Sequence, residues 1–310
     1  MRSSQAGRSG TGKAAHRPPK ASATASRLDC AEAFQRIARD CAAAITAHHS
    51  SACAGDEEAV HLIRVAITRL KAAVSFFAAM TADAEWPRLK KEIAWLNGSL
   101  GAARDTDVAM DYAGRKRYRS WAQYRIGKDL DRCRIRDHRR LVRCLRSVRF
   151  RRLIEDAAVW IERGPWVARW EQAGRRKPPG PLRAYCAHKL DRWHRRLVRK
   201  GRHLATMDES DRHRLRIKAK RFRYMLEALE DIVAVRGAVE FRRRHKAARR
   251  LQRALGDLRD LRHFGRLGDM PPHQGDQHGG RRPPGYRKQR QKLLEAAIAA
   301  CQSLEQAGAR

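Results

Sequence analysis

One pattern of basic residues occurs twice in this chain of 310 residues, in two segments that each read as a single amphipathic helix. The segments are HLIRVAITRLK at 61–71 and HRLRIKAKRFR at 213–223, and they are 152 residues apart. In a helix, the first, fourth, eighth and eleventh residues of such a segment fall within about 80° of one another, while apolar side chains cover the opposite face. Each segment is therefore predicted to bury one side in a core and to present a stripe of cations on the other.

A positive stripe that is written twice indicates two halves of the chain that face one anionic ligand. The candidate binding residues in these segments are His61, Arg64, Arg69 and Lys71 in the first, and His213, Arg216, Lys220, Arg221 and Arg223 in the second. Each histidine lies at the edge of a cationic stripe, which would weaken metal binding but suits donation to the oxygens of an anion.

A second motif, Leu-Gly-x-x-Arg-Asp, also occurs twice, at 100–105 and at 255–260. It adds Arg104 and Arg259 to the candidates, together with Lys90, which precedes Arg104 on the same predicted helix.

Two other residue types in this motif carry expectations of their own. A glycine inside a helix costs about 1 kcal/mol relative to alanine, so Gly101 and Gly256 are expected to permit close approach of a neighbouring helix. Asp105 and Asp260 follow arginines, and we expect them to orient arginine side chains rather than to act in catalysis.

The charge balance points to an anionic partner. The chain has 69 Lys and Arg against 33 Asp and Glu, a net charge of +36, so self-repulsion opposes compaction unless a polyanion neutralises it. Nucleic acid, polyphosphate and anionic lipid all satisfy this requirement. The seven cysteines include no CxxC pair and are expected to be reduced thiols of a cytoplasmic protein. No apolar run is long enough to span a membrane, and no metal or cofactor is expected.

The apolar periodicity predicts an all-α fold, and alternation typical of strands is missing from the sequence. Helices are predicted at 28–50, 57–80, 86–113, 115–163 with a break near Ser147, 181–203, 210–233, 238–264 and 286–306. This divides the chain into a disordered basic tail (1–26) and one domain (27–306). The domain comprises a first repeat (27–163), a linker (164–181) and a second repeat (182–306) with a flexible loop at 265–285.

At these motifs the chain resembles a known family, the conserved histidine α-helical domain or CHAD. Val60 to Lys71 resembles its signature Val-His-x-x-Arg-Val-Ala-x-x-Arg-Leu followed by a base, and 100–108 resembles Leu-Gly-x-x-Arg-Asp-x-Asp-Val. Residues 213–224 resemble His-x-Leu-Arg-Ile-x-x-Lys-Arg-x-Arg-Tyr, and 255–260 resemble the closing Leu-Gly-x-x-x-Asp. The resemblance spans roughly 28–304. It departs from the family at Thr68, where a base is common, and at Arg259, where Asn is common.

The resemblance implies two pseudo-symmetric four-helix bundles, produced by internal duplication, around a central basic channel. It also implies non-catalytic binding of inorganic polyphosphate and, for some members, association with polyphosphate granules. In some relatives a triphosphate-hydrolase domain accompanies this one, and the sequence shows no such domain here, which favours binding alone.

Two other functions remain as alternatives. A sequence-nonspecific nucleic-acid-binding protein would have the same charge, but aromatic residues are only 6% of the chain and no stacking platform or recognition helix is evident. A polyphosphate-metabolising enzyme would need an acidic cluster that holds a metal. Residues 7–14 (GRSGTGKA) approach a phosphate-binding loop, but no strand precedes them, and Ala14 replaces the hydroxyl that would hold magnesium.

Overall fold

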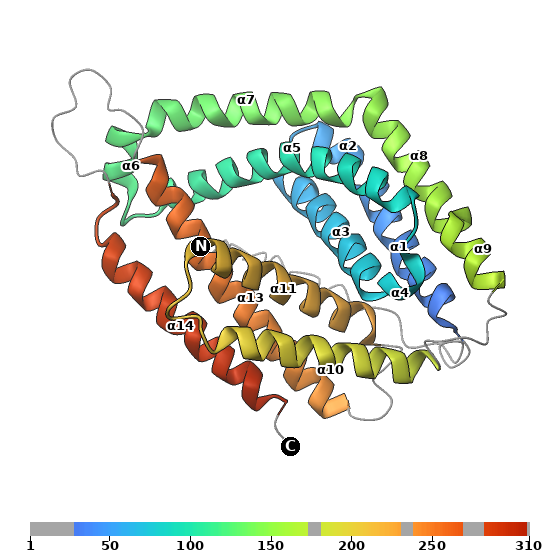
Figure 1. Cartoon of the computed structure of the whole chain (residues 1–310). Helices are drawn as coiled ribbons and strands as arrows, with labels where there is room; N and C mark the ends of the chain where they lie inside the picture. The colour runs from blue at the N-terminus through green and yellow to red at the C-terminus, as the bar shows by residue number, and fades with distance from the viewer. Residues whose placement is uncertain (1–27, 173–180, 231–237, 269–281, 309–310) are drawn as a thin grey trace, which may run out of the picture.

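The computed structural model describes residues 28–172, 181–230, 238–268 and 282–308, and every regular element within these ranges is a helix (Figure 1). The predicted all-α fold is confirmed. The first half of the chain forms α1 (Cys30–Ala47), α2 (His49–Cys53), α3 (Glu57–Phe76), α4 (Ala78–Thr81), α5 (Glu85–Gly114), α6 (Arg119–Arg125), α7 (Gly127–Leu145), α8 (Val148–Arg163) and α9 (Pro165–Gln172). The second half forms α10 (Leu182–Gly201), α11 (Glu209–Ala228), α13 (Ala238–Leu267) and α14 (Tyr286–Gln306).

Polar side chains fix the starts of the helices that matter most here. Asp56 accepts hydrogen bonds from the backbone N–H groups of Glu58 and Ala59 at the start of α3, at 2.8 and 3.3 Å. Asp208 accepts one from the N–H of Asp211 at the start of α11, at 2.7 Å. These caps satisfy backbone donors that a helix leaves free, and their charge suits the positive end of the helix dipole.

Several boundaries differ from those predicted. The expected helix at 115–163 is divided into α6, α7 and α8, and the break near Ser147 is confirmed because this residue caps α8. Part of the predicted linker is helical as α9, where the buried Trp166 donates a hydrogen bond to the carbonyl of Trp160 at 2.9 Å. Helix α13 continues to Leu267, past the start of the predicted loop. The tail at 1–26 and most of the loop at 265–285 lie outside the described residues.

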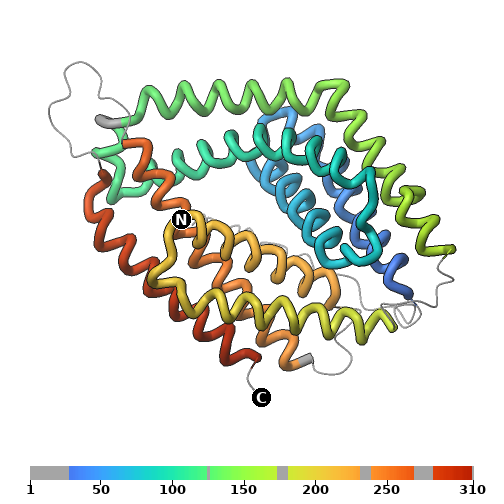
Figure 2. Tube along the Cα trace, in the orientation of Figure 1, coloured from blue at the N-terminus to red at the C-terminus, as the bar shows by residue number. Residues whose placement is uncertain are grey.

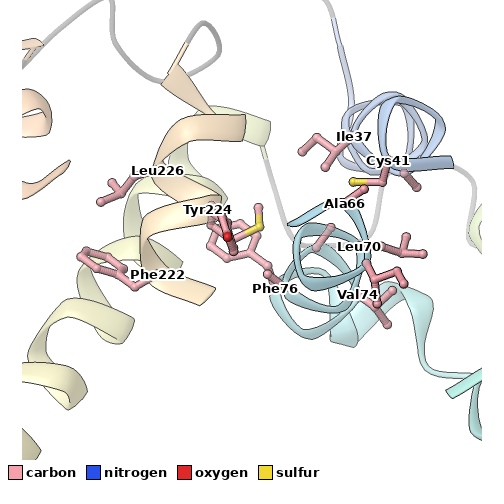
Figure 3. Packing of buried hydrophobic residues seen from close by; sticks show 14 of the residues in the cluster. Ile37, Cys41, Ala66, Leu70, Val74, Phe76, Phe222, Tyr224 and Leu226 are labelled. Atoms are coloured by element: carbon pink, nitrogen blue, oxygen red, sulfur yellow. The ribbon is translucent and has the colours of Figure 1, made fainter. Parts of the chain in front are cut away.

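The two halves meet through their corresponding helices. Helix α3 packs on α11, and α5 packs on α13. Figure 2 shows the first half of the chain, blue to green, beside the second half, yellow to red. The members of each pair have equal lengths, 20 residues for α3 and α11 and 30 residues for α5 and α13. One continuous apolar core contains residues of both halves, and Figure 3 shows some of those from α1, α3 and α11. Burial of this shared surface supplies the main force that holds the halves together.

Aromatic clusters join the halves at two places. At the end of α3, the ring of Phe76 lies 5.8 Å from Tyr185 and 5.3 Å from Trp193, both on α10. At the end of α5 and just beyond it, a second apolar core gathers the rings of Tyr112, Tyr118 and Trp121 around Phe264 of α13, with centroids 5.3 to 5.4 Å from it.

Candidate anion-binding site

The contact between α3 and α11 brings cations of both halves together. Arg64 and Arg216, which correspond in the two sequence motifs, are both half-buried. Burial lowers the pKa of Arg64, and Arg259, Arg104 and Arg216 lower it further while Asp105 opposes them. Burial, followed by the charge of Arg259, likewise lowers the pKa of Arg216. Cations of both halves therefore share a poorly hydrated region in which an anion would be stabilised.

Lys220 shows this effect most clearly. Burial lowers its pKa to about 7, and the charges of Arg216, Arg64, Arg223 and Arg259 add to the shift. The ammonium lies 5.9 Å from the centre of the Tyr224 ring. A lysine with this pKa exchanges its proton near neutral pH, so its charge responds to whatever binds beside it.

The two histidines occupy different surroundings. His61 is half-buried, and burial followed by the charge of Arg104 lowers the pKa of its imidazole. His213 is more exposed, and partial burial with the charges of Arg216 and Arg259 lowers its pKa as well. Both rings are therefore mainly neutral at pH 7, and a bound anion would favour the protonated form.

An ion pair links the two copies of the Leu-Gly-x-x-Arg-Asp motif. Arg259 donates hydrogen bonds to Asp105 of the other half at 2.5 Å and to Asp260 at 3.0 Å. Burial alone would raise the pKa of Asp105, but the hydrogen bond and charge of Arg259 outweigh it and hold this pKa below its usual value. The expectation that these aspartates orient arginines is thus confirmed at Arg259, and Asp105 does so across the boundary between the halves.

A cavity of about 680 Å³ lies where the start of α11 meets the end of α13 and the start of α14. Three predicted residues line it, namely His213, Arg216 and Arg259. Its polar wall also contains cations and a tyrosine outside the predicted set, namely Arg212, Arg262, His263, Arg266, Arg282, Tyr286 and Arg290. Two acids at the start of α11, Asp208 and Glu209, line it as well. All lining residues belong to the second half, whereas the predicted channel would have walls from both halves.

The sequence explains why only the second half of the chain forms such a basic cavity. Arg259, Arg262, His263 and Arg266 are spaced to share one face of α13. The positions 155 residues before Arg262 and Arg266 hold Asp107 and Asp111. These arginines therefore have no basic counterpart in the first half, and only the helical spacing within α13 indicates that they share a face. Charge is therefore distributed unequally between the two halves.

Two of the predicted residues are held by an acid that the sequence analysis did not select. Glu227 of α11 accepts from Arg69 of α3 at 3.2 Å and from Arg223 one turn earlier on its own helix. His245 lies 3.2 Å from the same carboxylate. The guanidinium of Arg69 lies 5.5 Å, and that of Arg223 4.2 Å, from the centre of the buried Tyr224 ring. An anion that recruits these arginines would have to compete with Glu227.

The remaining predicted residues form a separate group toward the end of α3. Burial lowers the pKa of Lys71, and the charges of Arg221 and Lys90 add to the shift, so these three cations are neighbours. Lys90 is exposed and precedes Arg104 by 14 residues on α5, about 21 Å along a helix. The structure therefore places Lys90 with Lys71 and not with Arg104.

The predicted close approach at the two motif glycines is wrong. A Cβ atom built on Gly101 or on Gly256 would meet no atom within 4 Å. Neither residue has a positive φ that would require glycine. Both glycines lie beside open space on the helices that carry Arg104 and Arg259, so they leave room next to the cations.

Across the described ranges, no three or more His, Cys, Asp or Glu side chains are grouped so that they could hold a metal ion. In the same part of the chain, no helix combines the length and the apolar character needed to cross a bilayer. The seven cysteines are free thiols.

Comparison with known proteins places the chain in a family. The family model described as the CHAD domain matches residues 36–267. The crystal structure of the CHAD domain from the plant Ricinus communis is similar with a TM-score of 0.67 and 25% identity, covering 93% of this chain and 97% of that one. PptA from Streptomyces chartreusis has a similar fold with a TM-score of 0.57 at 16% identity, covering 90% and 97%. A search of curated proteins finds no match. The extent of the family match, together with the likeness in fold, shows that this chain belongs to the CHAD domain family.

Proposed function

We propose that this protein binds inorganic polyphosphate through the cations of α3, α5, α11 and α13, without altering the polymer chemically. The observation that carries the proposal is the convergence of Arg64, Arg216 and Lys220 in one region where burial and mutual repulsion lower their pKa values. Arg259 adds its charge to this region, although Asp105 and Asp260 already pair with it. Such a group of cations is costly unless an anion neutralises it. The family membership and the net charge of +36 support the same ligand class.

The chemistry of the ligand fits these side chains. Polyphosphate carries about one negative charge per phosphate unit, and its neutralisation would release condensed counterions as it does for nucleic acids. The planar guanidinium of arginine can donate two parallel hydrogen bonds to one phosphate group. The low aromatic content disfavours nucleic acid, since single-stranded bases are held mainly by stacking.

A non-catalytic role is proposed because the acids near the site serve as counter-ions. Asp105 and Asp260 pair with Arg259, and Glu209 pairs with Arg262 and Arg266 at the large cavity. Incubation with polyphosphate and magnesium or manganese should therefore release no phosphate and leave the chain length unchanged on gels. Shortening of the polymer would overturn this part of the proposal.

The binding itself is tested by the affinity for polyphosphates of graded length, with duplex DNA at equal charge concentration as competitor. We expect polyphosphate to bind more tightly than DNA, with affinity rising with length until the cationic region is filled. Displacement of polyphosphate by equal charge of DNA would show that the preference is wrong.

A variant locates the site. His213→Ala with Arg216→Ala should weaken polyphosphate binding steeply and flatten its dependence on salt, because fewer counterions are released. Arg140→Ala is a suitable control, since Arg140 is exposed on α7 and lines neither cavity described in this structure. An unchanged salt slope in the double variant would place the site elsewhere. If the proposal holds, a fluorescently tagged form of the protein should mark cytoplasmic polyphosphate granules.

A further inference from the structure

A second cavity, of about 420 Å³, lies between α10 and α11 and reaches Ser75 of α3. Its apolar part is formed by Trp193, Leu197 and Phe222. Its polar part consists of cations: Arg196, Arg199, Lys200, Lys218 and Arg221. The residues that line it in the described structure include no acid. We call it the α10–α11 cavity.

The cations of this cavity repel one another without local compensation. Burial lowers the pKa of Lys218, and contact with the Lys200 side chain and the charge of Arg196 lower it further. Both lysines line the cavity and are exposed, so solvent screens part of the repulsion between their charges. Such an arrangement favours binding of an anion between them.

Comparison with the first half shows what this cavity lacks. Arg221 lies 152 residues after Arg69, and Glu227 lies 152 residues after Ser75. Arg69 reaches across the α3–α11 contact to Glu227 at 3.2 Å. Arg221 and Ser75 correspond to Arg69 and Glu227, and both line the α10–α11 cavity. Ser75 has an uncharged hydroxyl where Glu227 has a carboxylate. Burial alone lowers the pKa of Arg221. Arg69 therefore has a carboxylate partner within the chain, whereas at the position that corresponds to this partner Arg221 has only Ser75.

We propose that the α10–α11 cavity is a second anion site, which binds a short phosphoanhydride independently of the cations gathered around Arg64 and Arg216. Its volume lies in the range of small-ligand pockets. Lys200, Lys218 and Arg221 would hold the phosphates, and Ser75 would donate a hydrogen bond. The phosphoanhydride has two sources, a free oligophosphate or a nucleoside triphosphate whose base lies on Trp193. The proposed function does not depend on this site, nor the site on that function.

The test measures tripolyphosphate binding to the full chain by titration calorimetry in the His213→Ala, Arg216→Ala background. Adding Lys200→Gln and Lys218→Gln should weaken the remaining binding about tenfold or more, since each lysine would donate a charge-assisted hydrogen bond. The matched control in the same background is Lys246→Gln with Lys292→Gln, two exposed lysines outside both cavities. It removes the same charge and should change the affinity by less than about twofold.

The outcomes separate the two proposals. Equal weakening by the control pair, or loss of all tripolyphosphate binding in the background alone, would overturn the second site and leave the proposed function standing. A third outcome is that the His213→Ala, Arg216→Ala variant still binds tripolyphosphate through Lys200 and Lys218 and binds long-chain polyphosphate as tightly as the unmodified protein. This result would support the second site and overturn the polyphosphate site around Arg64 and Arg216.

A comparison of ATP with tripolyphosphate shows which kind of phosphoanhydride the cavity binds. Tighter binding of ATP than of tripolyphosphate in the background variant would assign a nucleoside triphosphate, and equal or weaker binding would assign free oligophosphate. The Lys200→Gln, Lys218→Gln variant should melt no lower than its parent without ligand, because it removes two repelling charges. If its helical circular dichroism is lost, Lys218→Gln alone provides the same comparison.

Discussion

The charge of Lys220 makes ligand binding depend on pH near neutrality. With a pKa of about 7, this lysine is protonated below pH 7 and loses its proton above it. An anion binds the protonated form, so above pH 7 binding must take up a proton and the affinity must fall. The stability of the free protein depends on pH in the opposite direction. The unfolded chain keeps the ordinary pKa of 10.5, so the contribution of Lys220 to stability rises with pH between the two values.

We therefore predict that the affinity for polyphosphate falls as pH rises from about 7 to about 9, and that Lys220→Arg removes much of this fall because arginine stays charged. Calorimetry in buffers of different ionisation enthalpy would detect the proton uptake. In the free protein the pKa values of His61, His213 and His263 are all lowered from 6.5, so these rings are already mainly neutral where this window begins. An equal pH slope in the Lys220→Arg protein would contradict the assignment to Lys220.

At the scale of residues, the cations of the site could be predicted from the sequence, but the side chains that contact them could not. The spacing of Arg64, Arg216 and Lys220 on helices is enough to predict that they face the same region. Glu227 and Tyr224 were not predictable in the same way, because the residues 152 positions earlier are Ser75 and Ala72. A residue that differs between the halves leaves no repeated signal, and its role depends on a contact between helices far apart in the sequence.

At the scale of helices, the contact between α3 and α11 contains a carboxylate, that of Glu227, which competes with a bound anion for arginines. Glu227→Gln would release Arg69 and Arg223 from their carboxylate. We expect this variant to bind polyphosphate more tightly, with a steeper salt dependence, and to melt at a lower temperature because Arg223 is left without its ion pair. Fluorescence anisotropy across a salt series and thermal unfolding measure the two effects.

Glu230→Gln is the matched control, since Glu230 is an exposed acid just beyond α11. It changes the net charge by the same amount and should alter the affinity only slightly. If both variants bind equally, the gain reflects net charge and not the freed arginines.

The open space beside the motif glycines leads to another prediction for α5 and α13. Because a Cβ on Gly101 or Gly256 meets no neighbour, alanine should raise the free energy of unfolding by about 1 kcal/mol at each position through helix propensity alone. Urea unfolding of the single and double variants provides the measurement. A loss of stability would mean that a neighbouring side chain already uses this space.

Helix identity and approximate helix position were predictable from the sequence because apolar periodicity and N-caps are local. The division of 115–163 into three helices was not predicted. Tyr118 and Ile126 lie at the two breaks, and Trp121 lies in the short helix α6 between them. All three pack in the second apolar core with Phe264 of α13. Tertiary packing therefore overrides the helical preference of this segment. The same core explains why α13 extends past the predicted start of the loop.

Across the whole molecule, a net charge of +36 is held on one continuous apolar core. A ligand that binds only the folded chain stabilises it in proportion to the logarithm of its concentration. We predict that long-chain polyphosphate raises the melting temperature well above the value with orthophosphate at equal charge and ionic strength. Scanning calorimetry compares the two, and equal shifts would show that general screening, rather than a polymer-sized site, accounts for the stabilisation.

The shared core also bears on how such a chain can be divided. Phe76 packs against Tyr185 and Trp193, and Phe264 against Tyr112, so each half completes apolar surfaces that the other begins. Fragments separated between α9 and α10 would each expose matching aromatic faces to water. Produced together, they would be drawn into a non-covalent complementation pair, whereas either one produced alone would be prone to aggregate.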